Sequence, residues 1–273
     1  MPGLRSSAIA SLVVLAACSA SDVPPVAVSP VVVTPAAPAT APESPAASPT
    51  GGPGESPTAP GPIRIAGLPE QGVAIERDGG VDLVDFFGRR VAHLDGFTIF
   101  QSTDAPGNLV LARGSGFFLL EEFRRRLRPL ASERAARRWQ EADENHPDFP
   151  APRSGGKPMT GHWRYSVSDP RYGDRFLAQW SGECEAPIAF FVDRDEGEVE
   201  PVTGEADPAT APESFALGWN KRGQAVLFLP QGECGAGARR PGVYLSRDAG
   251  EGHLLVGTPP GATARMWGTT VAG

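Results

Sequence analysis

The sequence predicts an all-β domain, and three observations support this fold class. The stretch GDRFLAQWSGEC at Gly173–Cys184 returns as GQAVLFLPQGEC at Gly223–Cys234, at a fixed offset of 50 residues. A second repeat has an offset of 36 residues: the unit that begins at Val73 aligns with the unit that begins at Leu109. From Ile63 onward, short apolar runs alternate with glycine-containing turns, which is typical of strands joined by hairpins.

Residues 1–17 have the pattern of a secretory signal. Arg5 supplies a positive charge, and Ala8–Ala17 is a largely apolar run of ten residues, too short to span a bilayer. The run ends in Leu15-Ala16-Ala17-Cys18, which resembles the lipobox of bacterial lipoproteins. The resemblance implies cleavage before Cys18 and lipidation of its sulfur, hence a stable anchor on the extracytoplasmic face of the cell membrane. An ordinary signal peptide, with Cys18 incidental, is the alternative.

The segment that follows, residues 18–62, predicts a disordered tether. It consists almost wholly of Pro, Ala, Ser, Thr, Val and Gly, a composition that cannot bury enough apolar surface to offset its chain entropy. Fully extended at roughly 3.1 Å per residue, it would reach on the order of 130 Å. The folded domain is therefore expected at residues 63–273, held away from the membrane.

Within the domain, each unit is expected to contribute a short meander of strands. The first has runs at 73–76, 81–84 and 91–94, and the second repeats them from Leu109. The helix formers of residues 131–142, with Ser132 as N-cap, and a loop at 145–158 form an insertion over residues 131–160. The later units have runs at 176–180, 188–193, 199–202, 225–229, 243–246 and 254–257.

Three units are preceded by a further strand, at 97–101, 163–167 and 215–219, and the first unit lacks one. Met266-Trp267-Gly268 echoes Leu217-Gly218-Trp219 and fits as the missing strand. Units of four strands and roughly 40 residues, closed by a terminal strand, resemble β-propellers, closest in style to bacterial TolB-type repeats. The resemblance implies about four blades. An open or sandwich-like β domain, or a ring of five or more blades, is the alternative.

Two features of this domain are expected to be structural. Trp180, Trp219 and Trp267 are expected to fill space between sheets, with ligand stacking as the alternative. Cys184 and Cys234 occupy matching positions after the second strands of consecutive units, so an extracytoplasmic disulfide is the simplest expectation. Two free thiols or a metal site remain open. A bridge would close a loop of 50 residues and stabilise the fold by roughly 4 kcal/mol.

No motif in the sequence identifies catalysis, a cofactor or a metal. The four histidines lack ligand spacing, Asp193–Glu198 departs from a calcium loop, and Gly114-Ser115-Gly116 is a hairpin turn rather than a nucleophile elbow. The formal net charge of −7 disfavours nucleic acid as a partner. The one cationic cluster is a candidate patch for an anionic partner, with a solvated, partly paired face as the alternative. It comprises Arg124, Arg125, Arg126, Arg128, Arg134, Arg137 and Arg138.

These observations lead to a non-catalytic binding or scaffolding function for a lipid-anchored, monomeric domain of the cell envelope, with an envelope protein or polysaccharide as the expected partner. The argument from fold to function is an analogy. The alternative is an extracytoplasmic hydrolase or lyase with a carboxylate pair in the propeller channel. A solute-binding lipoprotein of a transporter is disfavoured because alternating βαβ segments are missing.

Overall fold

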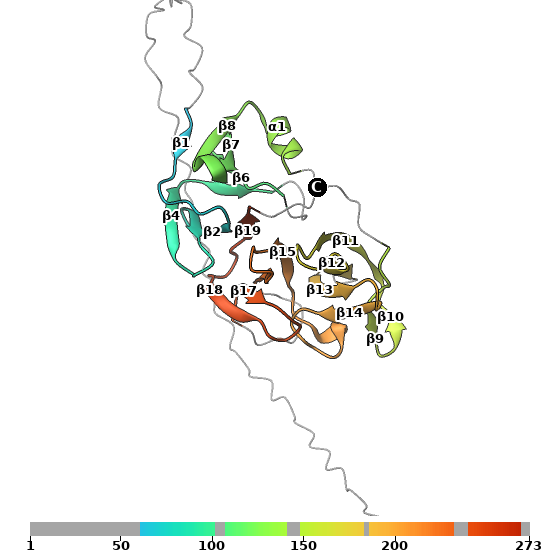
Figure 1. The fold of residues 1–273 in the computed structure, drawn as a ribbon. Coiled ribbons are helices and arrows are strands. Elements are labelled where there is room, and N and C mark those ends of the chain that lie inside the picture. The colour runs from blue at the N-terminus through green and yellow to red at the C-terminus, as the bar shows by residue number, and fades with distance from the viewer. Residues whose placement is uncertain (1–60, 102–106, 141–147, 183–185, 232–239, 269–273) are drawn as a thin grey trace, which may run out of the picture. The chain divides into compact units, whose positions relative to one another are not determined.

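A computed structural model describes residues 61–101, 107–140, 148–182, 186–231 and 240–268. The chain divides into two compact units, and all of the described residues belong to the second, Glu55–Gly273. This unit is mostly β, with several small antiparallel sheets (Figure 1). The predicted signal, Cys18, nearly all of the tether, Cys184 and Cys234 lie outside the described residues.

Sheet I pairs the last strand of the described chain with three strands from its first unit. Its order is β19-β2-β3-β4, from β19 (Ala264–Trp267), β2 (Gly72–Arg77), β3 (Gly80–Val84) and β4 (Arg90–Asp95). The register places Ala264 opposite Ile75 and Trp267 opposite Gly72. A Cβ atom at Gly72 would lie 2.4 Å from the Trp267 ring, so glycine leaves the space that the indole occupies. The C-terminal strand therefore completes the first unit, as predicted.

Sheet II has one strand more than the sequence predicted. Its order is β1-β8-β7-β6-β5, from β1 (Ile63–Arg64), β8 (Arg126–Leu130), β7 (Gly116–Glu121), β6 (Val110–Arg113) and β5 (Thr98–Phe100). A 3₁₀ turn, η1 (Glu122–Arg124), joins β7 to β8. The short β1 places Arg64 directly opposite Arg126. Residues 61–62, the described end of the predicted tether, therefore lead into the outer edge of sheet II.

Sheets III and IV are the two units that carry the 50-residue repeat. Sheet III runs in order through β11 (Gly161–Ser168), β12 (Arg175–Gly182), β13 (Pro187–Asp193) and β14 (Glu198–Pro201). Sheet IV runs through β15 (Phe215–Trp219), β16 (Ala225–Leu229), β17 (Gly242–Ser246) and β18 (His253–Gly257). The repeated stretches form the equivalent second strands, β12 and β16. A 3₁₀ turn, η2 (Pro208–Thr210), lies between the two sheets along the chain.

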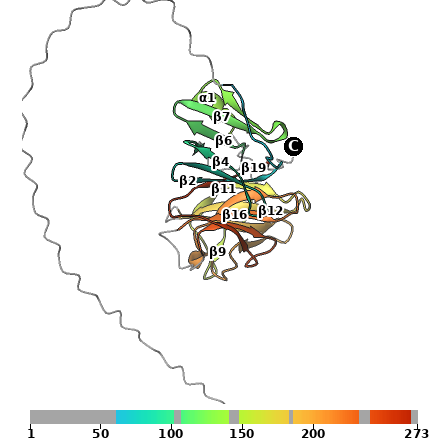
Figure 2. The same cartoon turned by 90° about the vertical axis from the view of Figure 1, so that its left-hand side faces the viewer.

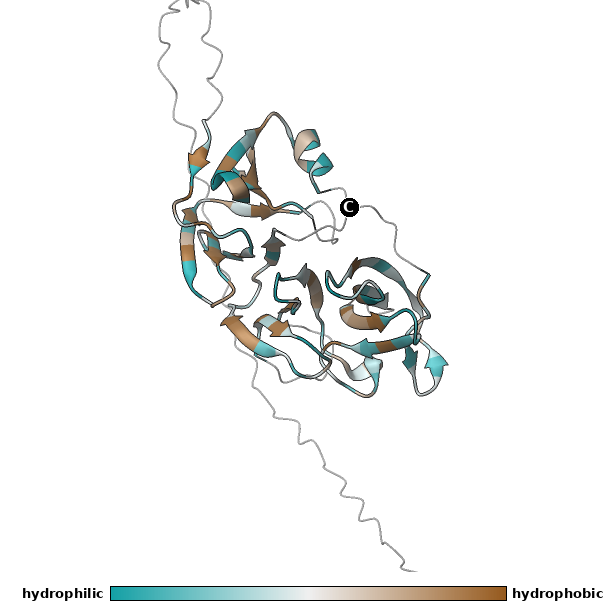
Figure 3. Cartoon of the chain, viewed as in Figure 1, coloured by the Kyte–Doolittle hydropathy of each residue, from teal (hydrophilic) through white to brown (hydrophobic). Residues whose placement is uncertain are grey.

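Apolar clusters pack the sheets in the order II, I, IV, III. Leu83 of sheet I packs with Leu111 and Leu127 of sheet II, in a cluster that includes Trp267. The opposite side of sheet I packs on sheet IV, and Leu177 of sheet III packs with Leu227 of sheet IV. β16 is covered on both faces, and all five of its residues are apolar and buried. Figure 3 shows brown, hydrophobic segments in many strands of the unit, alternating with teal ones.

The insertion at residues 131–160 packs on the outer faces of sheets II and III, which the clusters between sheets do not cover. The helix α1 (Glu133–Arg138) begins after Ser132, whose Oγ accepts a hydrogen bond from Ala135 N at 3.2 Å, so the predicted cap is confirmed. Ala136 of α1 packs on Val110 and Leu119 of sheet II. Further along, Phe149 packs in the cluster of sheet III. The insertion therefore supplies core residues on both sides.

The predicted loop at 145–158 is wrong in its last part. A hairpin of β9 (Arg153–Ser154) and β10 (Lys157–Pro158) forms there, and its turn residues Gly155 and Gly156 have φ of 54° and 77°. Two positive φ angles are what a tight two-residue hairpin turn needs, and glycine adopts them without steric cost. The flanking prolines concealed this signal, because proline is rare in strands that are paired on both sides.

Candidate binding pocket

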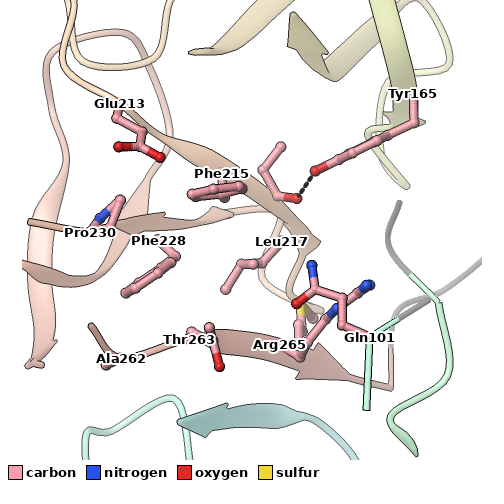
Figure 4. Close-up of a pocket in the computed structure, with 13 residues that line it drawn as sticks. Gln101, Tyr165, Glu213, Phe215, Leu217, Phe228, Pro230, Ala262, Thr263 and Arg265 are labelled. Atoms are coloured by element: carbon pink, nitrogen blue, oxygen red, sulfur yellow. Dashed lines mark hydrogen bonds between the residues drawn. The ribbon is translucent and has the colours of Figure 1, made fainter. Parts of the chain in front are cut away.

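A pocket of about 290 Å³ lies where the first strands of sheets I, III and IV meet the end of β5 (Figure 4). Its apolar wall is formed by Phe215 and Leu217 of β15, Phe228 of β16, and Ala264 and Met266 of β19. Figure 1 shows the same place from further away, with β15 and β19 near the middle of the unit and β4, β14 and β18 toward its outside. The pocket is thus built by four segments that are distant in sequence.

Five polar residues line the same pocket: Gln101, Tyr165, Glu213, Thr263 and Arg265. Arg265 projects from β19 with only 5% of its surface exposed. Figure 4 shows Gln101 beside it, whereas Glu213 lies at the other end of the apolar wall near Pro230. A few polar groups set around an apolar surface are typical of small-molecule sites, where they fix orientation and provide specificity.

Hydrogen bonds between sheets III and IV hold one wall of the pocket in place. The Tyr165 hydroxyl donates to Ala216 O at 2.8 Å, the contact dashed in Figure 4. Behind it, Gln179 Nε2 donates to Ser214 O at 2.9 Å, and Gln179 Oε1 accepts from Ala216 N at 2.8 Å. The amide of Gln179 therefore pairs with β15 and its preceding residue much as a neighbouring strand would, which fixes the position of Phe215.

Only one of the described residues that line the pocket, Glu213, is a carboxylate. Glycosidase-type catalysis uses two carboxylates, one on each side of the scissile bond. Within the described chain, no group of three or more His, Cys, Asp and Glu residues is placed to hold a metal ion. The arrangement is suited to holding a small molecule by apolar contact and hydrogen bonds.

The predicted core tryptophans are buried, which confirms their structural role. Trp180, Trp219 and Trp267 are 3%, 2% and 1% exposed, and none of them lines the pocket. The Trp219 indole N–H donates to Val167 O at 2.9 Å and ties sheet IV to sheet III. The Trp267 indole N–H donates to Pro69 O at 3.2 Å. The indole N–H groups of Trp219 and Trp267 are thus used within the fold, whereas Trp180 Nε1 is buried with no hydrogen-bond partner among the described residues.

The predicted arginine cluster is spread over sheet II and α1. Arg126 and Arg128 each donate to Glu121 at 2.7 Å, and Arg124 lies 3.8 Å from the same carboxylate. The pKa of Glu121 lies below its usual value. Burial alone would raise this pKa, but the hydrogen bonds and positive charges of the arginines outweigh burial. Arg137 pairs with Glu133 on α1, whereas Arg134 and Arg138 are exposed there and Arg125 is exposed at the end of η1.

The pocket residues have no local signature by which the sequence could reveal them. Gln101, Tyr165, Glu213 and Arg265 come from separate units and share no motif. One signal was present, since Arg265 interrupts an apolar strand, and a charged residue in a buried strand usually has a specific role.

Comparison of the chain with protein-family models, with curated proteins and with solved structures finds no match. In the part of the chain that the structure describes, no helix has the length and apolar character needed to cross a membrane.

Proposed function

We propose that the chain is an extracytoplasmic lipoprotein whose β domain binds a small, partly apolar molecule in the pocket between the first strands of its sheets. The observation that carries this proposal is the pocket itself, which combines an apolar wall with Gln101, Glu213 and Arg265. Its volume of about 290 Å³ suits a small ligand rather than a polymer segment.

The fold proposed for this module is a four-bladed propeller. Each of the four larger sheets contains a meander of three or four consecutive strands. The pairing of β19 with β2 joins the last segment to the first unit, as in propellers closed by a terminal strand. The pocket then corresponds to the mouth of a central channel. Ligand sites are common at such positions, which supports binding rather than scaffolding alone.

Binding is tested with an aromatic sulfonate dye, anilinonaphthalene sulfonate, which combines an apolar ring system with one anionic group. The full chain is expected to bind the dye, and Thr263→Trp is expected to weaken binding at least about tenfold, because the indole would occupy the space beside Leu217. Dye fluorescence during titration measures this. Thr263→Ser is the control and should bind normally. Equal affinity in the Trp variant would refute the pocket as the site.

The anchor is tested separately by metabolic labelling with a radioactive fatty acid. The wild-type chain should incorporate label and fractionate with the membrane, because the sulfur of Cys18 would carry the lipid. Cys18→Ala should lose the label. Label retained by that variant would overturn the assignment of residues 15–18 as a lipobox, and it would leave the result of the dye titration unaffected.

A further inference from the structure

Three exposed aromatic side chains lie in turns of the domain, each beside an arginine. Phe87 is 66% exposed between β3 and β4, Phe123 is 81% exposed between β7 and β8, and Tyr172 is 54% exposed between β11 and β12. Phe87 and Phe123 occupy equivalent places in sheets I and II, 36 residues apart. Large exposed aromatics are uncommon on a solvated surface, and their recurrence at equivalent turns indicates a surface that contacts a partner.

Side-chain contacts join the turns of sheets I, III and IV into one surface. The guanidinium of Arg222, in the turn between β15 and β16, lies 4.9 Å from the centre of the Phe87 ring, and Arg89 lies 5.1 Å from it on the same turn as Phe87. Arg171 lies 5.1 Å from the Tyr172 ring and donates to Gly223 O at 2.6 Å. The turns of sheets I, III and IV are therefore in contact with one another.

The turn of sheet II is connected through the segment that enters sheet I. Ile65 N donates to Arg125 O at 2.8 Å, and Lys221 pairs with Glu70. The pKa of Glu70 lies below its usual value because Lys221 donates a hydrogen bond to it and attracts its charge, and Arg125 adds a smaller attraction. The segment from Ile65 to Glu70 therefore contacts both the turn that carries Arg125 and the turn that carries Lys221.

The surface that these contacts define is called the aromatic-basic face and consists of Phe87, Phe123, Tyr172, Arg89, Arg125, Arg171, Lys221 and Arg222. Three of its five cations are paired, with Asp85, Asp169 and Glu70. Arg125 and Arg222 form no ion pair with a described carboxylate. Arg125 and Arg222 are therefore cations beside exposed aromatic rings, while Glu122 and Asp174 are acids in the turns that carry Phe123 and Tyr172.

Arg125 is held in a conformation that arginine rarely adopts. It is the only non-glycine residue with positive φ among those described, at 50°, and its N–H donates to Glu122 O. The turns between the third and fourth strands of sheets I, III and IV each contain a glycine with positive φ, Gly88 at 77°, Gly197 at 69° and Gly250 at 78°. L-residues adopt this region at a steric cost, and such strain often marks a functional position.

We propose that the aromatic-basic face docks on an anionic phospholipid surface, with the aromatic rings at the headgroup level and the arginines on the phosphates. Exposed aromatic rings surrounded by cations fit this boundary, because the rings bury apolar area while the cations gain about 1 kcal/mol each near the surface. The described end of the predicted tether leads into β1, where Arg64 lies opposite Arg126 on the sheet that carries Phe123. The inference deepens the proposed anchoring by adding a second membrane contact.

The test uses the chain from position 18 onward with Cys18→Ser, so that no lipid anchor contributes. It is expected to sediment with vesicles of phosphatidylcholine and phosphatidylglycerol but not with phosphatidylcholine alone, and to be released by salt. Arg125→Gln with Arg222→Gln should weaken partitioning about fivefold for each arginine. Phe87→Ser with Phe123→Ser should weaken it about tenfold.

The matched control removes the same charge elsewhere on sheet II. The control variant is Arg134→Gln with Arg138→Gln, both on α1, which follows the end of β8 that is distant from η1. Its vesicle partitioning should stay within about twofold of the parent chain. Equal weakening in the control pair, or no preference for phosphatidylglycerol, would overturn the proposal. Binding to soluble alginate that needs the arginines but not the phenylalanines, without vesicle binding, would replace the lipid by a polysaccharide.

Arg125→Gly separates docking from folding. Because glycine relieves the strained backbone, this variant should have a higher thermal unfolding temperature than the parent chain. It should nevertheless bind the vesicles more weakly than the parent chain does. Reduced binding by a variant that is more stable than the parent cannot be caused by loss of the fold. Unchanged vesicle binding by Arg125→Gly would contradict a role for this arginine in docking.

Discussion

Trp267→Ala is expected to lower the free energy of unfolding by about 4 kcal/mol, the typical cost of removing a large aromatic side chain from a core. Trp267 is 1% exposed and packs in the cluster between sheets I and II. Its ring occupies the space above Gly72, and its N–H donates to Pro69 O. The substitution would leave a cavity at the only strand that sheet I receives from the C-terminal end of the described chain.

Urea unfolding followed by tryptophan fluorescence and circular dichroism measures this loss. Trp139→Ala is the matched control, because Trp139 is 41% exposed at the end of α1 and packs against Arg128. The control should cost less than about 1 kcal/mol. The burial of β19 indicates that it contributes to the core. An equally small loss of stability in both variants would contradict this.

Gln179→Ala is expected to lower the free energy of unfolding by about 3 kcal/mol. Gln179 is fully buried and its amide bonds to Ser214 O and Ala216 N, so truncation leaves a donor and an acceptor of β15 and its preceding residue without partners. Ala216 also accepts the Tyr165 hydrogen bond. The change therefore loosens the wall of the pocket as well as the contact between sheets III and IV.

Gln179→Met distinguishes hydrogen bonding from packing, since methionine has similar length but cannot pair with the backbone. It should lose stability almost as much as the alanine variant. The Ala216 amide should exchange with solvent faster in both variants, measured by hydrogen–deuterium exchange. A methionine variant as stable as the parent would show that the amide contacts contribute little.

Most of the strand pattern could be predicted because the local signals are strong. β15 and β16 have the bounds that the apolar runs indicated, and β19 could be placed because its tryptophan repeats that of β15. The hairpin at 153–158 was missed because its prolines contradict strand propensity. β1 was missed as a paired strand because two residues carry no periodicity.

The pocket could not be predicted, because it depends on tertiary arrangement. Tyr165 and Arg265 lie within strands, whereas the other polar residues, Gln101, Glu213 and Thr263, lie just outside them. Only the packing of different sheets brings these residues together. The aromatic-basic face was also hidden, since the exposure of Phe87 and Phe123 depends on turns that point away from the core. The arginines were visible in the sequence, but their separation between η1, β8 and α1 was not.

The way sheet I is assembled has a consequence for the order of folding. The contact between Trp267 and Pro69 joins residues 198 positions apart, so sheet I stays incomplete until the last strand of the described chain is available. Figure 2 shows β19 within the folded unit, where its paired neighbour in sheet I is β2. Contacts of such long range slow folding, because loop closure must precede the stabilising interactions. A chain that is exported as proposed would therefore remain unfolded, and competent for translocation, until its C-terminal residues emerge.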